Sequence, residues 1–105
     1  MEKWDNENTT NLILALLSLQ NKKEMKNFLR DLLTEQEIIE FGKRWQAAQM
    51  LSKGLSYVVI VKKTGLSSTT VARISKWLKQ GAGGYCLALK KIHDHHYNAR
   101  REMVP

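Results

Sequence analysis

Apolar residues recur at steps of three and four along most of the chain, which is the period of an amphipathic α-helix. Pro105 is the only proline, and no Gly/Pro cluster occurs before Gly81. Because proline and glycine are the residues that most often interrupt helices, the pattern predicts helix through most of the interior. We expect an all-α fold of about six helices in a single domain over residues 1–105, with loose termini at residues 1–5 and 98–105.

Two amphipathic helices are predicted in the first third of the chain. The first begins after Asp5 or Asn8 and has a wide apolar stripe that can pack internally or across a dimer: Leu12, Ile13, Leu16, Leu17 and Leu19. Asn21 followed by Glu24 predicts the capped start of a second, short helix. Its buried face is expected to carry Met25, Phe28, Leu29, Leu32 and Leu33.

A long third helix is predicted to begin at a capping box. In the stretch from Thr34 to Glu37, the threonine oxygen and the glutamate can each satisfy a free backbone N–H of the other residue. Gly54 then supplies the left-handed position that commonly ends a helix. One face of this helix carries Ile38, Phe41, Trp45, Ala48 and Leu51.

The segment from Ser56 to Lys79 has the pattern of a helix-turn-helix. A short helix from Ser56 to about Lys63 is followed by the turn Thr64 to Leu66, and Ser67 caps a further helix that reaches about Gln80. Such a turn needs a residue that tolerates positive φ, which Gly65 provides. The apolar residues expected to lock the two helices together are Ile60, Leu66, Val71 and Ile74.

A last helix is predicted from about Tyr85 to His95, after the break formed by residues 81–84. It presents Leu87, Leu89 and Ile92 on its apolar side. The basic tail after it is expected to be loose.

Charge is distributed unevenly along the chain, whose net charge is +7. Residues 1–52 carry seven Lys/Arg against eight Asp/Glu, whereas residues 53–105 carry ten against two. This asymmetry is typical of a half that binds a polyanion, because each neutralised phosphate releases condensed counterion. General solubility is the alternative explanation.

The second helix of the helix-turn-helix supplies the candidate DNA contacts. These are Ser67, Ser68, Thr69, Arg73 and Lys76. Hydroxyls and free backbone N–H groups at a helix N-terminus suit phosphate oxygens, and arginine can bind guanine with two hydrogen bonds. The alternative is that the hydroxyls only cap the helix and that Arg73 is a solvated side chain.

Two stretches, Asn27 to Lys53 and Gly65 to Tyr85, resemble the tryptophan-repressor-related family, in particular its short branch of the YerC/YecD type. The resemblance covers most of residues 16–89. It implies an intertwined, Trp-repressor-like homodimer in which paired recognition helices read two half-sites on double-stranded DNA. The implied function is a sequence-specific, repressor-like regulator of transcription.

The resemblance also implies a possible effector pocket. The residues matching the family's corepressor site are Thr34, Arg44, Thr70 and Arg73. Two positions depart from that pattern, because Ile74 stands in place of a pocket glycine and Trp77 in place of a ligand-binding serine. We expect these larger side chains to fill the cavity, so that tryptophan is not the corepressor; no cofactor is predicted, and the identity of any effector is open.

A further departure lies in the first helix of the helix-turn-helix. Val58 and Val61 stand where the family's repressor has basic residues that contact DNA. The resulting apolar patch can pack on the C-terminal helix or on another protein. This leaves a second hypothesis, in which the helix-turn-helix scaffold serves as a protein-protein interaction module.

Other chemistry is weakly represented in the sequence. Cys86 is the only cysteine, so neither an intrachain disulfide nor a four-cysteine zinc site can form, and a reducing cytoplasm is the expected location. The apolar run from Leu12 to Leu17 is far shorter than the roughly 20 residues that span a bilayer, so no membrane association is expected.

A cluster of histidines near the C-terminus is a candidate metal site. His93, His95 and His96 with Asp94 are neighbours that point in different directions on a helix, so we predict no metal site. The cysteine, histidines and carboxylates form no recognisable set of nucleophile, base and orienting group. We therefore predict that the chain is not an enzyme.

Overall fold

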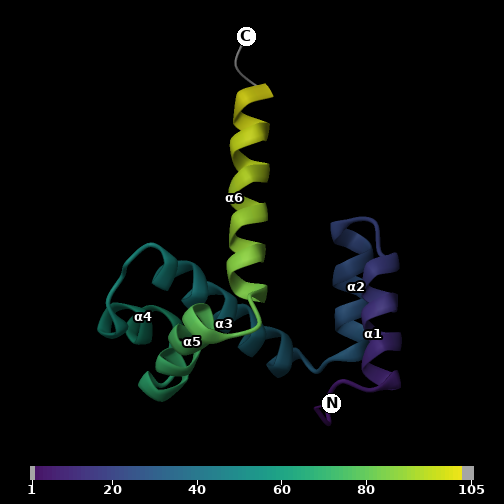
Figure 1. Ribbon diagram of the computed structural model, residues 1–105, viewed down its shortest axis with the longest axis horizontal. Coiled ribbons are helices and arrows are strands. Elements are labelled where there is room, and N and C mark those ends of the chain that lie inside the picture. Colours follow the sequence, from purple (N-terminus) through teal and green to yellow (C-terminus); the bar gives the residue numbers. More distant parts are fainter. Residues whose placement is uncertain (1, 103–105) are drawn as a thin grey trace. The chain divides into compact units, whose positions relative to one another are not determined.

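The computed structural model describes the backbone of residues 2–102 and the side chains of residues 2–94. Over the described backbone the chain forms six α-helices and no β-strand (Figure 1), as the sequence predicted. The helices are α1 (Glu7–Ser18), α2 (Lys22–Leu32), α3 (Glu35–Ser52), α4 (Tyr57–Thr64), α5 (Ser68–Gln80) and α6 (Gly84–Glu102). They fall into two compact units, Met1–Ile39 and Glu40–Pro105. The assignment of residues 1–105 to one domain stays a prediction.

The first unit holds α1 and α2, which run in opposite directions (Figure 1). The cap of α1 is Asn6, rather than Asp5 or Asn8, because its side chain accepts a hydrogen bond from the Thr9 N–H at 3.0 Å. Asn21 caps α2 as predicted, accepting from the Glu24 N–H at 2.9 Å. Within the N-terminal segment that was expected to be loose, a turn is closed by a hydrogen bond from Asp5 N to Glu2 O.

Apolar side chains in this unit remain largely uncovered. Neither α1 nor α2 contains a buried residue, and Leu14 and Leu17 are 58% and 75% exposed. The face of α2 expected to be buried is therefore only half-buried, with Leu32 exposed. The unit itself does not provide enough apolar surface to bury these side chains, so their burial requires a further surface.

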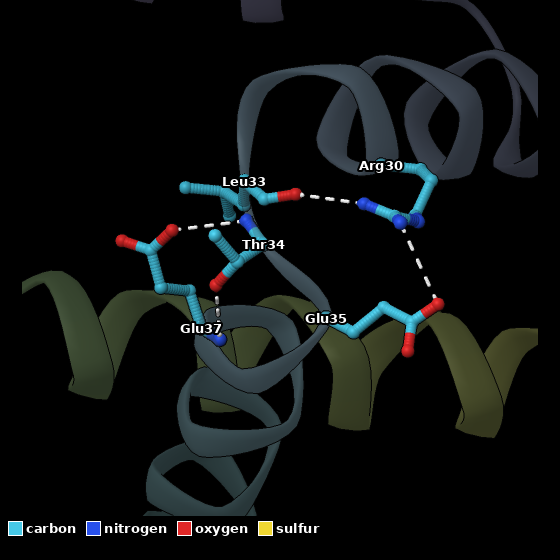
Figure 2. A network of polar contacts seen from close by, with 5 residues as sticks. All are labelled: Arg30, Leu33, Thr34, Glu35 and Glu37. Atoms are coloured by element: carbon cyan, nitrogen blue, oxygen red, sulfur yellow. Dashed lines mark hydrogen bonds and ion pairs between the residues drawn. The ribbon is translucent and has the colours of Figure 1, made fainter.

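The start of α3 is the capping box that the sequence predicted (Figure 2). The Glu37 N–H donates to Thr34 Oγ1 at 3.1 Å, and the Thr34 N–H donates to Glu37 Oε1 at 2.9 Å. Arg30 adds to the junction by donating to the Leu33 carbonyl at 3.1 Å and approaching Glu35 Oε1 at 3.5 Å. Two free N–H groups are thus satisfied, which marks the beginning of the helix.

The hydrophobic core lies in the second unit. It is formed by α3, α4, the turn after α4, and α5: Ala47, Ala48, Met50, Ile60, Leu66, Val71 and Ile74. Trp45 packs against this core and stacks on Tyr85 of α6, with ring centres 6.3 Å apart. Ala48 of the predicted α3 face is buried, whereas Phe41 is 49% exposed and lies outside the core.

The last two helices are separated by a glycine-rich break, as predicted. Gly81 ends α5, where an added β-carbon would lie 2.4 Å from the Trp77 carbonyl oxygen, so a side chain cannot be accommodated without a shift. The expected end of α6 near His95 was wrong, because the helix continues to Glu102, whereas the expected looseness of residues 98–105 stays a prediction. Residues 103–105 lie outside the described part of the chain. None of the described helices has the length and apolar content needed to span a bilayer.

Candidate nucleic-acid interface

The turn between α4 and α5 has the geometry that a helix-turn-helix requires. Gly65 has φ +76°, in the left-handed region, and its N–H donates to the Val61 carbonyl at 2.9 Å. The buried hydroxyl of Thr64 donates to the Ile60 carbonyl at 2.7 Å and accepts from the Leu66 N–H at 3.1 Å. Sequence reasoning placed Thr64 in the turn but missed this linking role; its position directly before the glycine was the available signal.

The apolar lock between the two helices is confirmed. Ile60 and Val71 are fully buried, and Leu66 and Ile74 are 5% and 3% exposed. Burial of each such side chain stabilises the unit by roughly 1.5–3 kcal/mol. This contact fixes α5 on α4 and so determines which face of α5 is left for a partner.

Replacing Gly65 with alanine tests the turn. A β-carbon there would meet only Lys43 Nζ, at 3.9 Å, so the cost comes from the positive φ rather than from a clash. We expect a loss of about 1–2 kcal/mol in the free energy of unfolding, measured with urea. Gly42→Ala is the matched control, because Gly42 lies inside α3 with open space around it; this change should stabilise by about 0.5–1 kcal/mol. Equal effects of the two substitutions on stability would contradict the left-handed conformation assigned to Gly65.

Hydroxyl side chains surround the N-terminus of α5. Ser67 caps the helix, since its Oγ accepts from the Thr70 N–H at 3.1 Å and donates to Thr70 Oγ1 at 2.9 Å. Ser67 therefore has the capping role that the sequence offered as the alternative to a DNA contact. Ser68 and Thr69 are exposed in the first turn, where backbone N–H groups have no helical acceptor.

Arg73 and Lys76 follow on the same helix and are both exposed. Arg73 makes no ion pair with any described residue. Lys76 Nζ lies 5.9 Å from the centre of the Trp77 ring. Five Lys/Arg and no Asp/Glu occur between Ser56 and Gln80, so the helix-turn-helix carries positive charge without neutralising carboxylates of its own. Such a surface favours an anionic partner.

The four residues of the implied effector pocket have separate local partners. Thr34 is in the first unit, where its hydroxyl belongs to the capping box (Figure 2). Arg44 approaches Glu40 at 3.8 Å, and Thr70 accepts the Ser67 hydroxyl. No hydrogen bond or ion pair joins Arg44, Thr70 and Arg73 among the described residues, and the effector pocket remains a prediction.

The positions that depart from the family pattern differ in their burial. Ile74 is buried in the core, but Trp77 is 49% exposed within the single chain. Val61 packs against the core, whereas Val58 is 77% exposed. Among the described residues nothing therefore covers Val58, and the idea that it packs on the C-terminal helix is not supported there.

The histidines and the cysteine near the C-terminus form no metal-binding cluster within the described residues. His93 Nδ1 lies 3.7 Å from an Asp94 carboxylate oxygen, and the side chains of His95 and His96 lie outside the described range. Cys86 is exposed, and its Sγ donates to the Leu78 carbonyl at 3.2 Å.

A first helix that packs through buried Ile60 against a second helix, which exposes Arg73 and Lys76, defines an all-α helix-turn-helix protein. Comparison with known families identifies it further, because the model described as Trp repressor protein matches residues 7–93. The chain belongs to the Trp repressor family. The uncharacterised protein YerC of Bacillus subtilis (strain 168) is 31% identical over 94 residues, which are 90% of each chain, so the short YerC-type branch is also shown.

Solved structures support the same assignment. A TrpR-like protein from Eubacterium eligens ATCC 27750 superposes with a TM-score of 0.82 at 31% identity, over 87% of this chain and 94% of that chain. A structure from Staphylococcus aureus gives a TM-score of 0.81 at 28% identity, over 89% of this chain and 96% of that chain. The Trp-repressor-like fold predicted from the sequence is thereby confirmed.

Proposed function

We propose that this protein is a sequence-specific regulator of transcription, of the repressor-like kind, that binds double-stranded DNA as a homodimer through α4 and α5. The observation that carries the proposal is the exposed row of Ser68, Thr69, Arg73 and Lys76 on a helix held by a buried core. Membership of the Trp repressor family supports it. The lone cysteine favours a reducing cytoplasm as the location, and the exposed hydroxyl and basic side chains of α5 favour a binding role rather than catalysis.

The roles of the α5 residues follow from their chemistry. Ser68 and Thr69, with the free N–H groups of the first turn, suit a phosphate of the DNA backbone. Arg73 can donate two parallel hydrogen bonds to a guanine in the major groove, while Lys76 suits a phosphate as a point charge. Ser67 contributes by holding the start of α5 in place.

The defining experiment is selection of binding sequences from a random duplex library with the purified protein. A dimer with paired recognition helices should enrich a near-palindrome, because two half-sites mirror the symmetry of the protein. Affinity for the selected operator and for a scrambled duplex is then compared at two salt concentrations. A clear specificity ratio supports the proposal, whereas absence of enrichment contradicts sequence-specific binding.

The homodimer is proposed from the uncovered apolar faces of α1 and α2. Exposed leucines such as Leu14 and Leu17 contribute roughly 1.5–3 kcal/mol each when they become fully buried, and a second copy supplies a matching apolar surface. We expect the purified chain to sediment as a dimer. The double substitution Leu14→Glu and Leu17→Glu should shift it to monomer or unfold it, while Asn11→Glu on the same helix should not. A wild-type monomer would refute the dimer.

Tryptophan is not expected to be the corepressor. Ile74 and Trp77 add volume where the family's site has a glycine and a serine, so less space is left for an indole ring. Isothermal titration with tryptophan should give no stoichiometric binding in the micromolar range. Stoichiometric micromolar binding would refute this expectation; titration of Trp77→Ser would show whether removing that side chain opens a site.

The exposed valine favours one alternative function, a protein-protein interaction module. Val58 is 77% exposed at the start of α4, where an apolar contact would not depend on charge. DNA binding should weaken steeply with salt, whereas a contact through Val58 should barely respond. Salt-insensitive capture of a protein partner, lost in Val58→Asp and retained in Lys76→Ala, would favour the alternative.

A further inference from the structure

A cleft of about 500 Å³ opens in the second unit, away from the candidate DNA-binding residues. Its wall is formed by the end of α3, the start of α4, α5 and the first turns of α6. All lining residues belong to the unit of residues 40–105. The volume is within the range of about 300–1,000 Å³ that is usual for small-molecule pockets.

The wall is apolar with a small number of polar groups. Leu51, Leu55, Leu78 and Leu89 supply the apolar surface. Among the described residues, Lys79 is the only charged one that lines the cleft, and none of them brings a carboxylate to it. Apolar walls with one cation match a ligand that has a hydrocarbon body and one negative charge.

Ser75 is the polar lining residue that indicates a ligand-binding role for the cleft. The residue is 7% exposed, and its hydroxyl makes no hydrogen bond with any described residue. Every described side-chain nitrogen or oxygen that is fully buried has a hydrogen-bond partner. The Ser75 hydroxyl has none, so it is not fully buried, and we infer that its oxygen faces the cleft that the residue lines. A buried hydroxyl without a protein partner is satisfied by water or by a ligand.

Ser75 and Lys79 stand four residues apart on α5, so they are neighbours on one face of the helix. A carboxylate bound there can accept a hydrogen bond from the Ser75 hydroxyl and pair with the Lys79 ammonium, while a hydrocarbon chain lies on the leucines. We propose that this cleft binds a small apolar carboxylate, such as a medium-chain fatty acid.

The site differs from the one that the family resemblance implies. With about 100° between successive residues, Ser75 and Lys79 lie roughly opposite Thr70 and Arg73 on α5. A ligand in the cleft would contact α3, α4, α5 and α6 together. None of the candidate DNA contacts lines the cleft, so occupancy joins the helix-turn-helix to the C-terminal helix without contacting them.

Cys86 makes the proposal testable without DNA. It is the only cysteine, it is exposed, and it lines the same cleft. The reaction rate of its thiol with Ellman's reagent therefore reports occupancy, using the full-length protein in its native assembly. Octanoate should slow this reaction several-fold and with saturation, octanamide should do so less strongly, and acetate should have no effect.

Three variants test whether octanoate protects the Cys86 thiol by binding in the cleft. Lys79→Gln and Ser75→Ala should each weaken protection by octanoate, and Lys79→Gln should leave protection by octanamide unchanged. Lys91→Gln, an exposed cation of α6 that does not line the cleft, should retain it. The proposal is overturned if octanoate gives no protection, if Lys79→Gln is protected as well as the wild type, or if the thiol is unreactive without ligand because another chain covers it. The readout does not involve operator binding, so it is independent of the proposed function.

Discussion

Replacing Arg73 with alanine should weaken binding to the selected operator by about 1–3 kcal/mol for each half-site. The arginine is exposed on α5 and has no ion pair among the described residues, so its removal costs the fold little. Because a bidentate contact distinguishes guanine from other bases, the variant should also lose preference at one position of each half-site. Fluorescence anisotropy with the operator and with single-base variants measures both effects.

Two further variants separate the kinds of contact on α5. Lys76→Ala should weaken binding to all duplexes alike and reduce the slope of log affinity against log salt by about one unit for each lost phosphate contact. Lys23→Ala, an exposed cation of α2, should change neither affinity nor slope. An Arg73→Ala variant that keeps wild-type affinity and base preference would show that α5 is not the recognition helix.

Replacing Ile60 with alanine should lower the free energy of unfolding by about 2–5 kcal/mol. Ile60 is fully buried between α3, α4 and α5, and truncation leaves a cavity in the contact that braces α5. Urea unfolding measures the loss, at one fixed protein concentration because the stability of the proposed dimer would depend on concentration. Operator affinity should fall as well, since α5 loses its support.

Val58→Ala is the matched control for this experiment. Val58 lies on the same helix but is 77% exposed, so its truncation should change stability by no more than about 0.5 kcal/mol. If Ile60→Ala proved as mild as Val58→Ala, the buried lock between α4 and α5 would be the wrong description of what holds the recognition helix.

Local signals in the sequence located most of the helices. Asn21, Thr34, Ser56 and Ser67 were expected to begin helices, and each accepts a hydrogen bond from the backbone N–H three residues later. Such caps connect residues that are close in the chain, so they can be recognised without knowing the fold. The end of α6 was misplaced because the basic tail was taken for a loose segment, although residues 96–102 contain no glycine or proline.

Candidate site residues were predicted less completely than helices. Arg73 and Lys76 were found from charge and helical position, and the structure leaves both exposed. The polar links made by Thr64 and the cleft beside Ser75 were not anticipated. For Thr64 the only signal was its position directly before Gly65. The cleft depends on which sides of several helices face one another, and the sequence around Ser75 carries no signal of that.

Residue patterns alone predict the all-α class, the caps, the left-handed turn at Gly65 and the apolar residues that join α4 to α5. These features rest on backbone conformation and on helical spacing, which act over a few residues. Which apolar faces are covered depends on the tertiary structure. Ile60 is buried, whereas Phe41 and Val58 are exposed, although all three are apolar residues within predicted helices. Burial depends on surfaces contributed by residues distant in the chain, so helical periodicity alone cannot assign it.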